Sequence, residues 1–340
     1  MRWDDVNARA RGLATHFVSR LALEHLAEAP DLTGFVHRML GAGLLLETEG
    51  AVAASADEVD RAIGRLAAAR LTLLGRWLGP GRRRALAVIY ERLDLENLRR
   101  LLRGLVQGAS AGARLRGTVP TPDLPEPALL RLARAGSLAD LAQGLRRLGH
   151  PAGRALAREA EPRDRQALLR LELALIRLCA TRSTRLSRRG GSLLRLHVAL
   201  SIDLWNAWAL LEREHWGDAV RVEEAWLPGG RAIDEPAFRA LAVVANSSQR
   251  RERIARLLGA TPVGELLSDT TLEPAELEAR ALAVRIKHLR AIARREPLGA
   301  GPTLLTLLRI EAEARDLRSL LWGVVLRAPR EWLVSRLVAA

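Results

Sequence analysis

Pairs of acidic side chains are the features of this sequence that could most directly do chemistry. Glu91 and Asp94 are three residues apart, and Glu311 and Glu313 are two apart. Two carboxyl groups held close together can act as a general acid and a general base when their surroundings separate their pKa values. On helix surfaces such pairs are far more often solvated charges, and no nucleophile or base accompanies either pair. We therefore interpret them as surface charges.

The motifs of common enzymes are missing. No Gly-rich loop ends in Gly-Lys-Ser/Thr, and Gly41-Ala42-Gly43 runs into leucines rather than into a dinucleotide fingerprint. The seven His residues never form the two-His helical pair with a Glu between them that a zinc hydrolase needs. Cys179 is the single cysteine, which excludes an internal disulfide or a Cys-built zinc site. We predict a non-enzymatic protein with no catalytic residue, no cofactor and no metal site.

Charge and composition limit the possible partners. The net charge is +14, and nearly all of the cations are arginines. This balance favours an anionic partner, although a GC-rich genome would explain the arginine preference while leaving the net charge unexplained. A nucleic-acid binder would interleave clustered cations with stacking aromatics, and aromatic residues make up only 4% of the chain, so no nucleic acid is expected. A basic cytosolic helical scaffold for an anionic partner, whether nucleic acid or a lipid surface, is the alternative function.

Helical periodicity runs through almost the whole chain. Apolar residues recur at i, i+3, i+4 and i+7, and Pro- and Gly-rich breaks such as Gly79–Gly81 and Gly299–Pro302 separate the helical segments. No β-type alternation of useful length occurs. The chain has no run of about 18 uncharged apolar residues, and its charged N-terminus does not resemble a secretory signal. We predict an all-α protein that does not span a membrane.

One helical pattern occurs three times. The segments DLENLRRLLRG, DLWNAWALLER and EARDLRSLLWG begin at Asp94, Asp203 and Glu313, at separations of 109 and 110 residues. Asn97 of the first segment recurs as Asn206 and is replaced by Asp316 in the third. Such a period indicates repeated structural units, which we place at residues 1–113, 114–223 and 224–340. Three units of this kind predict a pseudo-symmetric molecule with rotations of about 120° between them.

A polar pair lies at one edge of each apolar stripe. On a helical wheel, Asp94 and Asn97 flank Leu101 and Leu105. Half-buried polar groups at equivalent positions must find partners, because an unpaired one costs about 1–3 kcal/mol. We interpret them as a recurring hydrogen-bonded lock between packed helices. The set comprises Asp94, Asn97, Asp203, Asn206, Glu313 and Asp316.

The outward face of the repeated helix differs between the units. Arg99, for example, corresponds to Trp208 and Arg318. An asymmetric partner on a pseudo-symmetric scaffold would produce this divergence, but so would packing against different neighbouring helices, and Trp suits either. The candidate partner contacts on this face are Arg99, Arg103, Trp205, Trp208, Arg318 and Trp322.

Arginines also gather in the connection that precedes each repeated helix. Three such connections would lie at one end of the molecule and form a positive rim. The rim is either simply solvated, or it faces an acidic partner or anionic lipid headgroups. Anionic headgroups stabilise each cation near a membrane surface by about 1 kcal/mol. Its members are Arg82, Arg83, Arg84, Arg188, Arg189, Arg294 and Arg295.

Several of these segments together resemble the C subunit of the V/A-type ATPases, which is the d subunit of the eukaryotic V-ATPase. They are VNARARGL at 6–13, DLENLRRLLRGL at 94–105, LPGGRAI at 227–233 and EARDLRSLLWG at 313–323. The resemblance covers essentially the whole chain, including the triplication, and Asp316 stands where Asn is usual.

The resemblance implies a funnel-shaped, all-helical protein of three similar bundles. It also implies a non-catalytic rotor protein that lies between the membrane ring of proteolipid subunits and the central shaft, which the D and F subunits form. Such a protein would be cytoplasmic and peripheral on the inner face of the membrane, and would couple rotation to proton or sodium transport.

Overall fold

All regular structure that can be described in this chain is helical. The computed structural model describes residues 3–45, 55–159, 165–188, 191–213, 222–259, 261, 263–268 and 274–338. Every regular element within these ranges is a helix, which confirms the all-α prediction. Across the same ranges, no helix combines the length and the apolar character that a membrane span requires.

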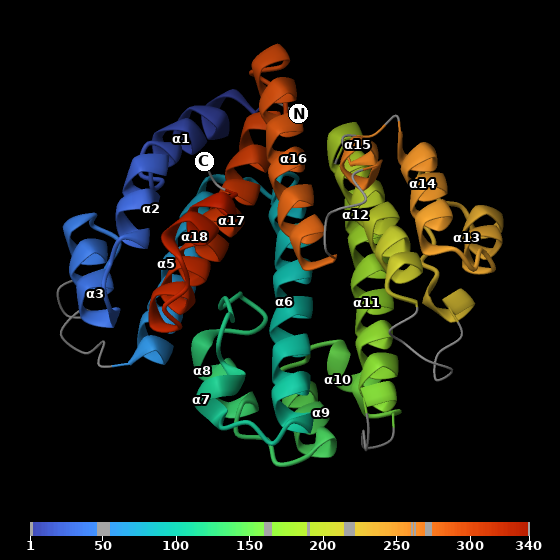
Figure 1. Ribbon diagram of the computed structural model, residues 1–340, viewed down its shortest axis with the longest axis horizontal. Coiled ribbons are helices and arrows are strands. Elements are labelled where there is room, and N and C mark those ends of the chain that lie inside the picture. Colours follow the sequence, from blue (N-terminus) through green and yellow to red (C-terminus); the bar gives the residue numbers. More distant parts are fainter. Residues whose placement is uncertain are drawn as a thin grey trace.

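The long helices of the described ranges form three antiparallel hairpins, each closed by a short connection (Figure 1). The hairpins pair α5 with α6, α11 with α12, and α16 with α17. The helices are α5 (Ala56–Trp77), α6 (Arg83–Val106), α11 (Arg165–Ser187), α12 (Ser192–Leu211), α16 (Pro274–Arg295) and α17 (Gly301–Val325).

Short helices fill the segments between and around the hairpins. They are α1 (Asp4–Ala14), α2 (Arg20–Ala27), α3 (Leu32–Gly41), α7 (Ala111–Arg114), α8 (Glu126–Leu132), α9 (Leu138–Arg147), α10 (Ala152–Leu156), the 3-10 helix η3 (Val222–Ala225), α13 (Glu235–Ala242), α14 (Ser247–Leu258), α15 (Gly264–Ser268) and α18 (Arg330–Ser335).

Side-chain caps set the start of many helices. Ser55 and Glu58 form a reciprocal capping box at the start of α5, in which each side chain binds the backbone N–H of the other residue. Asp234 caps α13 by accepting the N–H of Ala237 at 2.9 Å. These bonds satisfy N–H groups that the first helical turn leaves without intrahelical partners.

The long helices also pack against helices outside their own hairpins. Helix α6 packs along α11, and α17 packs against α5 as well as against its hairpin partner α16. Helix α17 is deeply enclosed, since Leu307, Leu308, Leu317, Leu320 and Leu321 are all fully buried. The burial of leucine stripes within and between hairpins therefore supplies the core.

The two ends of the chain meet in the same region. Helices α1, α2 and α3 all pack against α17, and α18 packs against α2. Figure 1 shows α1–α3 beside the C-terminal helices α17 and α18. The last third of the chain thus closes onto the first. The division at residues 113 and 223, the threefold relation and the funnel shape remain predictions.

Candidate functional site

Asn97 and Asn206 bind the backbone in the same way. On α6, Asn97 donates from Nδ2 to the carbonyl oxygen of Val119 at 2.8 Å and accepts the Val119 N–H at 2.9 Å. On α12, Asn206 makes the same two bonds with Leu227, both at 2.9 Å. Both amides are buried. Each asparagine therefore satisfies the backbone N–H and the backbone carbonyl oxygen of a residue that lies outside any helix.

Asp316 makes half of this arrangement on α17. Its carboxylate oxygens accept the N–H of Val338 at 2.9 and 3.0 Å. The substitution of Asp for Asn at this position keeps the contact with the backbone N–H, and it replaces the NH2 donor of the two asparagines with a second carboxyl oxygen.

Asp203 holds the turn that leads into α13. Its carboxylate accepts the N–H groups of Arg231, Ala232 and Ile233 at 2.9–3.1 Å. Three backbone N–H donors therefore converge on this one carboxylate. The turn approaches so closely that a Cβ on Gly230 would lie 2.2 Å from Oδ1 of Asp203. Any larger residue at position 230 would clash with the Asp203 carboxylate, so this position requires glycine.

The equivalent acids on α6 and α17 also bind the chain just ahead of a short helix. Asp94 accepts a hydrogen bond from Thr121 Oγ1 at 2.5 Å, and Thr121 Oγ1 accepts the N–H of Leu124 at 3.0 Å. Glu313 accepts the N–H of Val18 directly at 2.7 Å. These contacts lie ahead of α8 and α2, as the contacts of the acid on α12 lie ahead of α13. The bond from α17 joins the C-terminal third of the chain to its N-terminal segment.

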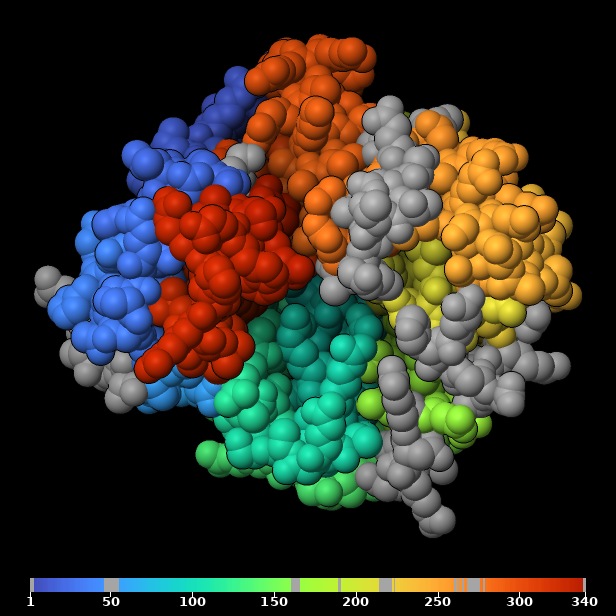
Figure 2. Space-filling model, viewed as in Figure 1, coloured from blue at the N-terminus to red at the C-terminus, as the bar shows by residue number. Residues whose placement is uncertain are grey.

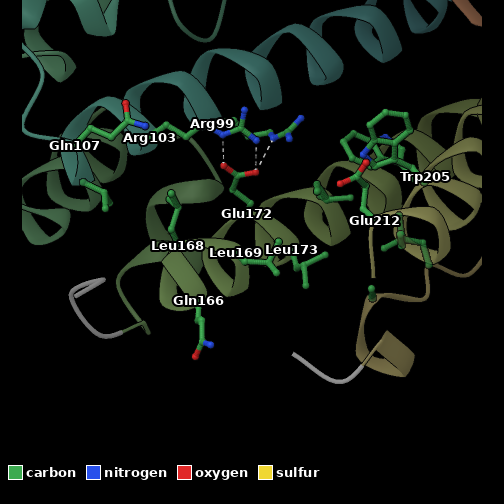
Figure 3. Close-up of a pocket in the computed structure, with 16 residues that line it drawn as sticks. Arg99, Arg103, Gln107, Gln166, Leu168, Leu169, Glu172, Leu173, Trp205 and Glu212 are labelled. Carbon is green, nitrogen blue, oxygen red and sulfur yellow. Dashed lines mark hydrogen bonds and ion pairs between the residues drawn. The ribbon is translucent and has the colours of Figure 1, made fainter. Parts of the chain in front are cut away.

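Arg99 and Arg103 of α6 meet Glu172 of α11 in a cleft of about 900 Å³. Figure 3 shows the Glu172 carboxylate between the two guanidinium groups, at 2.5 and 2.7 Å from Arg103 and 3.1 Å from Arg99. Trp205 of α12 lies with its ring 5.2 Å from the Arg99 guanidinium carbon. The Glu172 side chain is 7% exposed, whereas that of Arg103 is 49% exposed. The carboxylate thus orients both arginines while Arg103 faces the cleft.

A second cavity of about 460 Å³ adjoins the cleft and lies between α6, α12, α16 and α17. In Figure 2 the teal surface of α6 is recessed between the red and orange surfaces of α17 and α16. The two cavities share Arg99, Arg103, Trp205, Trp208 and Glu212. Four of the six predicted outward-face contacts therefore line one continuous hollow.

Arg285 of α16 brings a buried cation to the second cavity. Its side chain donates to Ser201 Oγ at 3.0 Å and lies 3.2–3.3 Å from the ring nitrogens of His197, while its Nε has no hydrogen-bond partner. Burial, and next the charge of Arg92, lowers the pKa of Arg285 to about 9. Burial also lowers the pKa of His197. Arg285 therefore meets the neutral side chains of Ser201 and His197 on α12.

The other two outward-face candidates lie elsewhere. Arg318 of α17 donates to the carbonyl oxygen of Thr118 at 2.6 Å, and Trp322 donates from Nε1 to Asp60 of α5 at 3.1 Å. The Arg116 guanidinium carbon lies 4.8 Å from the centre of the Trp322 ring. Both side chains therefore bind α5 and the segment after α7, and the structure does not bring them to the hollow.

The arginine connections occupy one end of the long helices, the upper end in Figure 1. Arg82 pairs with Asp5 at 2.5 Å, and Arg83 donates to the carbonyl oxygen of Leu78 at 3.1 Å. Arg84 is half-buried. Arg189 lies outside the described residues. The exposed members of the set are Arg83, Arg188, Arg294 and Arg295.

Sequence reasoning missed Glu172 and Arg285. The available signal for Glu172 was its place as the one acid within the apolar run Leu168–Ile176. Arg285 gave no comparable signal, because arginines occur throughout this chain. Only the three-dimensional structure, in which Arg285 contacts His197 and Ser201 of α12, shows that this one is buried.

Comparison with known protein families identifies the chain. The family described as ATP synthase (C/AC39) subunit matches residues 6–333. The chain belongs to this family. It therefore falls in the V/A-type ATPase class, as the resemblance implied. No curated protein matches the chain with significant similarity.

Three of the four acids in the predicted acid pairs of this C/AC39 chain bind arginines. Glu91 binds Arg182 at 2.5 Å, Glu311 pairs with Arg92, and Glu313 pairs with a third arginine, on α5. Asp94 and Glu313 are both only 3% exposed, so the prediction of solvated surface charges is wrong for these two. Within the described ranges, no three His, Cys, Asp or Glu side chains gather as metal ligands would. The ion pairs instead link helices.

Proposed function

We propose that this C/AC39 protein is a non-catalytic central-stalk component that links the central shaft of a V/A-type ATPase to its membrane rotor ring. The observation that carries the proposal is the separation of two surfaces suited to partners. The hollow follows α6 from Arg92 to Arg103, and the first arginine connection ends at Arg84. At 1.5 Å per residue, about 12 Å of helix separates the connection from the near edge of the hollow and about 30 Å from Arg103. A protein that bridges two partners needs such a separation.

The residues that line the hollow are suited to binding the end of the central shaft. Trp205 and Trp208 give it apolar aromatic walls, and Arg99 and Arg103 bring cations that are already oriented. Tryptophan and arginine are the residues that most often dominate binding energy at protein interfaces. We assign this surface to the shaft that the D and F subunits form.

The arginine connections are suited to the second partner, the membrane ring. Arg188, Arg294 and Arg295 are exposed at the end of the long helices, where the proteolipid ring loops or the lipid headgroups around them could approach. Attraction at such a rim acts mainly on the association rate and is screened beyond a Debye length of about 8 Å at physiological salt. Association with the ring should therefore depend on salt more strongly than association with the shaft.

The test is binding of the purified chain to the D–F shaft and, separately, to the proteolipid ring. Replacing Arg103 with Gln and Trp208 with Ala should weaken shaft binding at least about tenfold and leave ring binding unchanged. Arg131→Gln, on an exposed face of α8, is the matched control and should change neither.

Two results would overturn the proposal. One is a wild-type chain that binds neither the shaft nor the ring. The other is a wild-type chain that binds nucleic acid or anionic vesicles in preference to both of these partners, which would favour the basic scaffold instead.

A further inference from the structure

A separate cavity of about 340 Å³ lies where α1, α16 and α17 meet, near the α16–α17 connection. Four arginines line it, and no acidic residue does. Glu296, the acid in the adjoining connection, is not part of the lining. The arginines come from three helices and are Arg11, Arg290, Arg294 and Arg309.

These cations are not neutralised within the described residues. Arg309 lies with its guanidinium carbon 4.5 Å from the centre of the Phe17 ring, and its buried Nε has no hydrogen-bond partner. Burial, and next the charge of Arg290, lowers the pKa of Arg309. Arg11 makes one long bond of 3.4 Å to the carbonyl oxygen of Pro297. Four like charges around one cavity are unfavourable unless an anion joins them.

The wall of the cavity is fixed by a buried asparagine. Asn7 of α1 donates to the carbonyl oxygens of Pro297 and Gly299 at 3.0 and 2.8 Å, and accepts a hydrogen bond from Thr303 at 2.8 Å. Asn7 is 2% exposed. It therefore holds the α16–α17 connection against α1, and the arginines on either side need little rearrangement to meet a ligand.

We propose that this cavity binds a phosphate-type anion. Guanidinium groups match the geometry of phosphate oxygens with paired N–H donors, which explains why arginines recur at phosphate sites. Apolar side chains such as Leu305 line the remaining wall, so that a phosphate carried on a small organic group fits as well as inorganic phosphate. The proposal requires neither the shaft nor the ring, and it shares only Arg294 with the arginines assigned to the ring.

The phosphate could be free in solution or belong to a lipid headgroup, and both sources offer the same chemistry. The experiment therefore has two arms at constant ionic strength. Calorimetric titration with inorganic phosphate and pyrophosphate measures soluble ligands. Co-sedimentation with phosphatidylglycerol vesicles, against phosphatidylcholine vesicles, measures the headgroup.

The test variants are Arg290→Gln with Arg294→Gln, and separately Arg309→Lys, which keeps the charge but loses the paired donors. The control is Arg131→Gln with Arg147→Gln, which removes two exposed charges that lie outside both the cavity and the arginine connections. We expect saturable binding by the wild type and the control, and a dissociation constant at least about tenfold higher for both test variants.

Binding of soluble phosphates alone identifies a free ligand. Vesicle binding that depends on the same arginines and is displaced by pyrophosphate identifies a headgroup. The proposal is overturned if no probe binds saturably. It is equally overturned if the control pair weakens binding as much as the cavity pair, because the effect would then be one of net charge.

Discussion

Asn97 and Asn206 lie 109 residues apart in the chain and hold the peptides of Val119 and Leu227 with the same two hydrogen bonds. In each case the amide lies on a long helix and its partner follows 21 or 22 residues later. The amide side chain thus satisfies both the N–H and the carbonyl oxygen of a residue that lies outside any helix, where no intrahelical bond can satisfy them. The recurring motif therefore fixes the path of the chain after each of these helices.

Replacing Asn206 with Leu should lower the free energy of unfolding by about 1–3 kcal/mol, because the N–H and carbonyl of Leu227 lose their buried partner. Asn97→Asp, which places on α6 the residue that α17 carries, keeps the acceptor and should cost less than Asn97→Leu. Urea unfolding followed by circular dichroism measures all three. An Asn206→Leu protein that unfolds like the wild type but fails to bind the shaft would contradict the structural role.

Replacing Gly230 with Ala should destabilise the protein by about 1–3 kcal/mol, since the added methyl group overlaps a carboxylate that three N–H groups hold in place. Gly12→Ala is the control, because nothing lies within 4 Å of a Cβ at that exposed helical position. It should be neutral or slightly stabilising. Thermal unfolding of both variants tests whether Gly230→Ala is the less stable of the two. Equal melting temperatures would show that the turn can shift at little cost.

Replacing Glu172 with Gln should cost about 1–2 kcal/mol, because the two arginines lose a buried counter-charge while water still reaches Arg103. The comparison is Glu252→Gln on α14, where the carboxylate and its partner Arg256 are both mostly exposed. That change should fall within about 0.5 kcal/mol of the wild type. Similar losses in the two variants, measured by urea unfolding, would mean that Glu172 does not organise the cleft.

Cys179 should be unreactive in the folded protein. Burial, and next the charge of Glu91, raises the pKa of its thiol to about 12, so that at pH 8 only about one molecule in ten thousand carries the thiolate that reacts. Labelling with iodoacetamide should be about a thousandfold slower than for an unperturbed cysteine, and denaturant should restore the ordinary rate. Rapid labelling at pH 8 without denaturant would contradict this placement of the thiol.

The helices and the three recurring segments follow from local sequence, whereas the residues of the hollow depend on long-range packing. Periodicity predicted the helical class because each leucine stripe needs only a neighbouring helix to cover it. It also singled out Arg99 and Trp205 as an outward face. It could not say that α5 covers the same face of α17, which is why Arg318 and Trp322 lie in contacts within the chain.

The local sequence pattern could not predict the hydrogen-bond partners of the polar pair either. Asn97 predicts a hydrogen-bonded role from its place beside the apolar stripe, but nothing local identifies Val119. Glu172 joins the two arginines of α6 only because α11 packs along that helix.

Coupled ion transport would show most directly whether the chain connects shaft rotation to the membrane ring. The V/A-type complex would be reconstituted into vesicles with and without the chain, and ATP hydrolysis and ion uptake measured in the same sample. Without the chain we expect hydrolysis to continue and uptake to be lost, and the wild-type chain should restore uptake. The Arg103→Gln, Trp208→Ala protein should restore it less well than Arg131→Gln. Equal ion uptake with and without the chain would contradict a linking role.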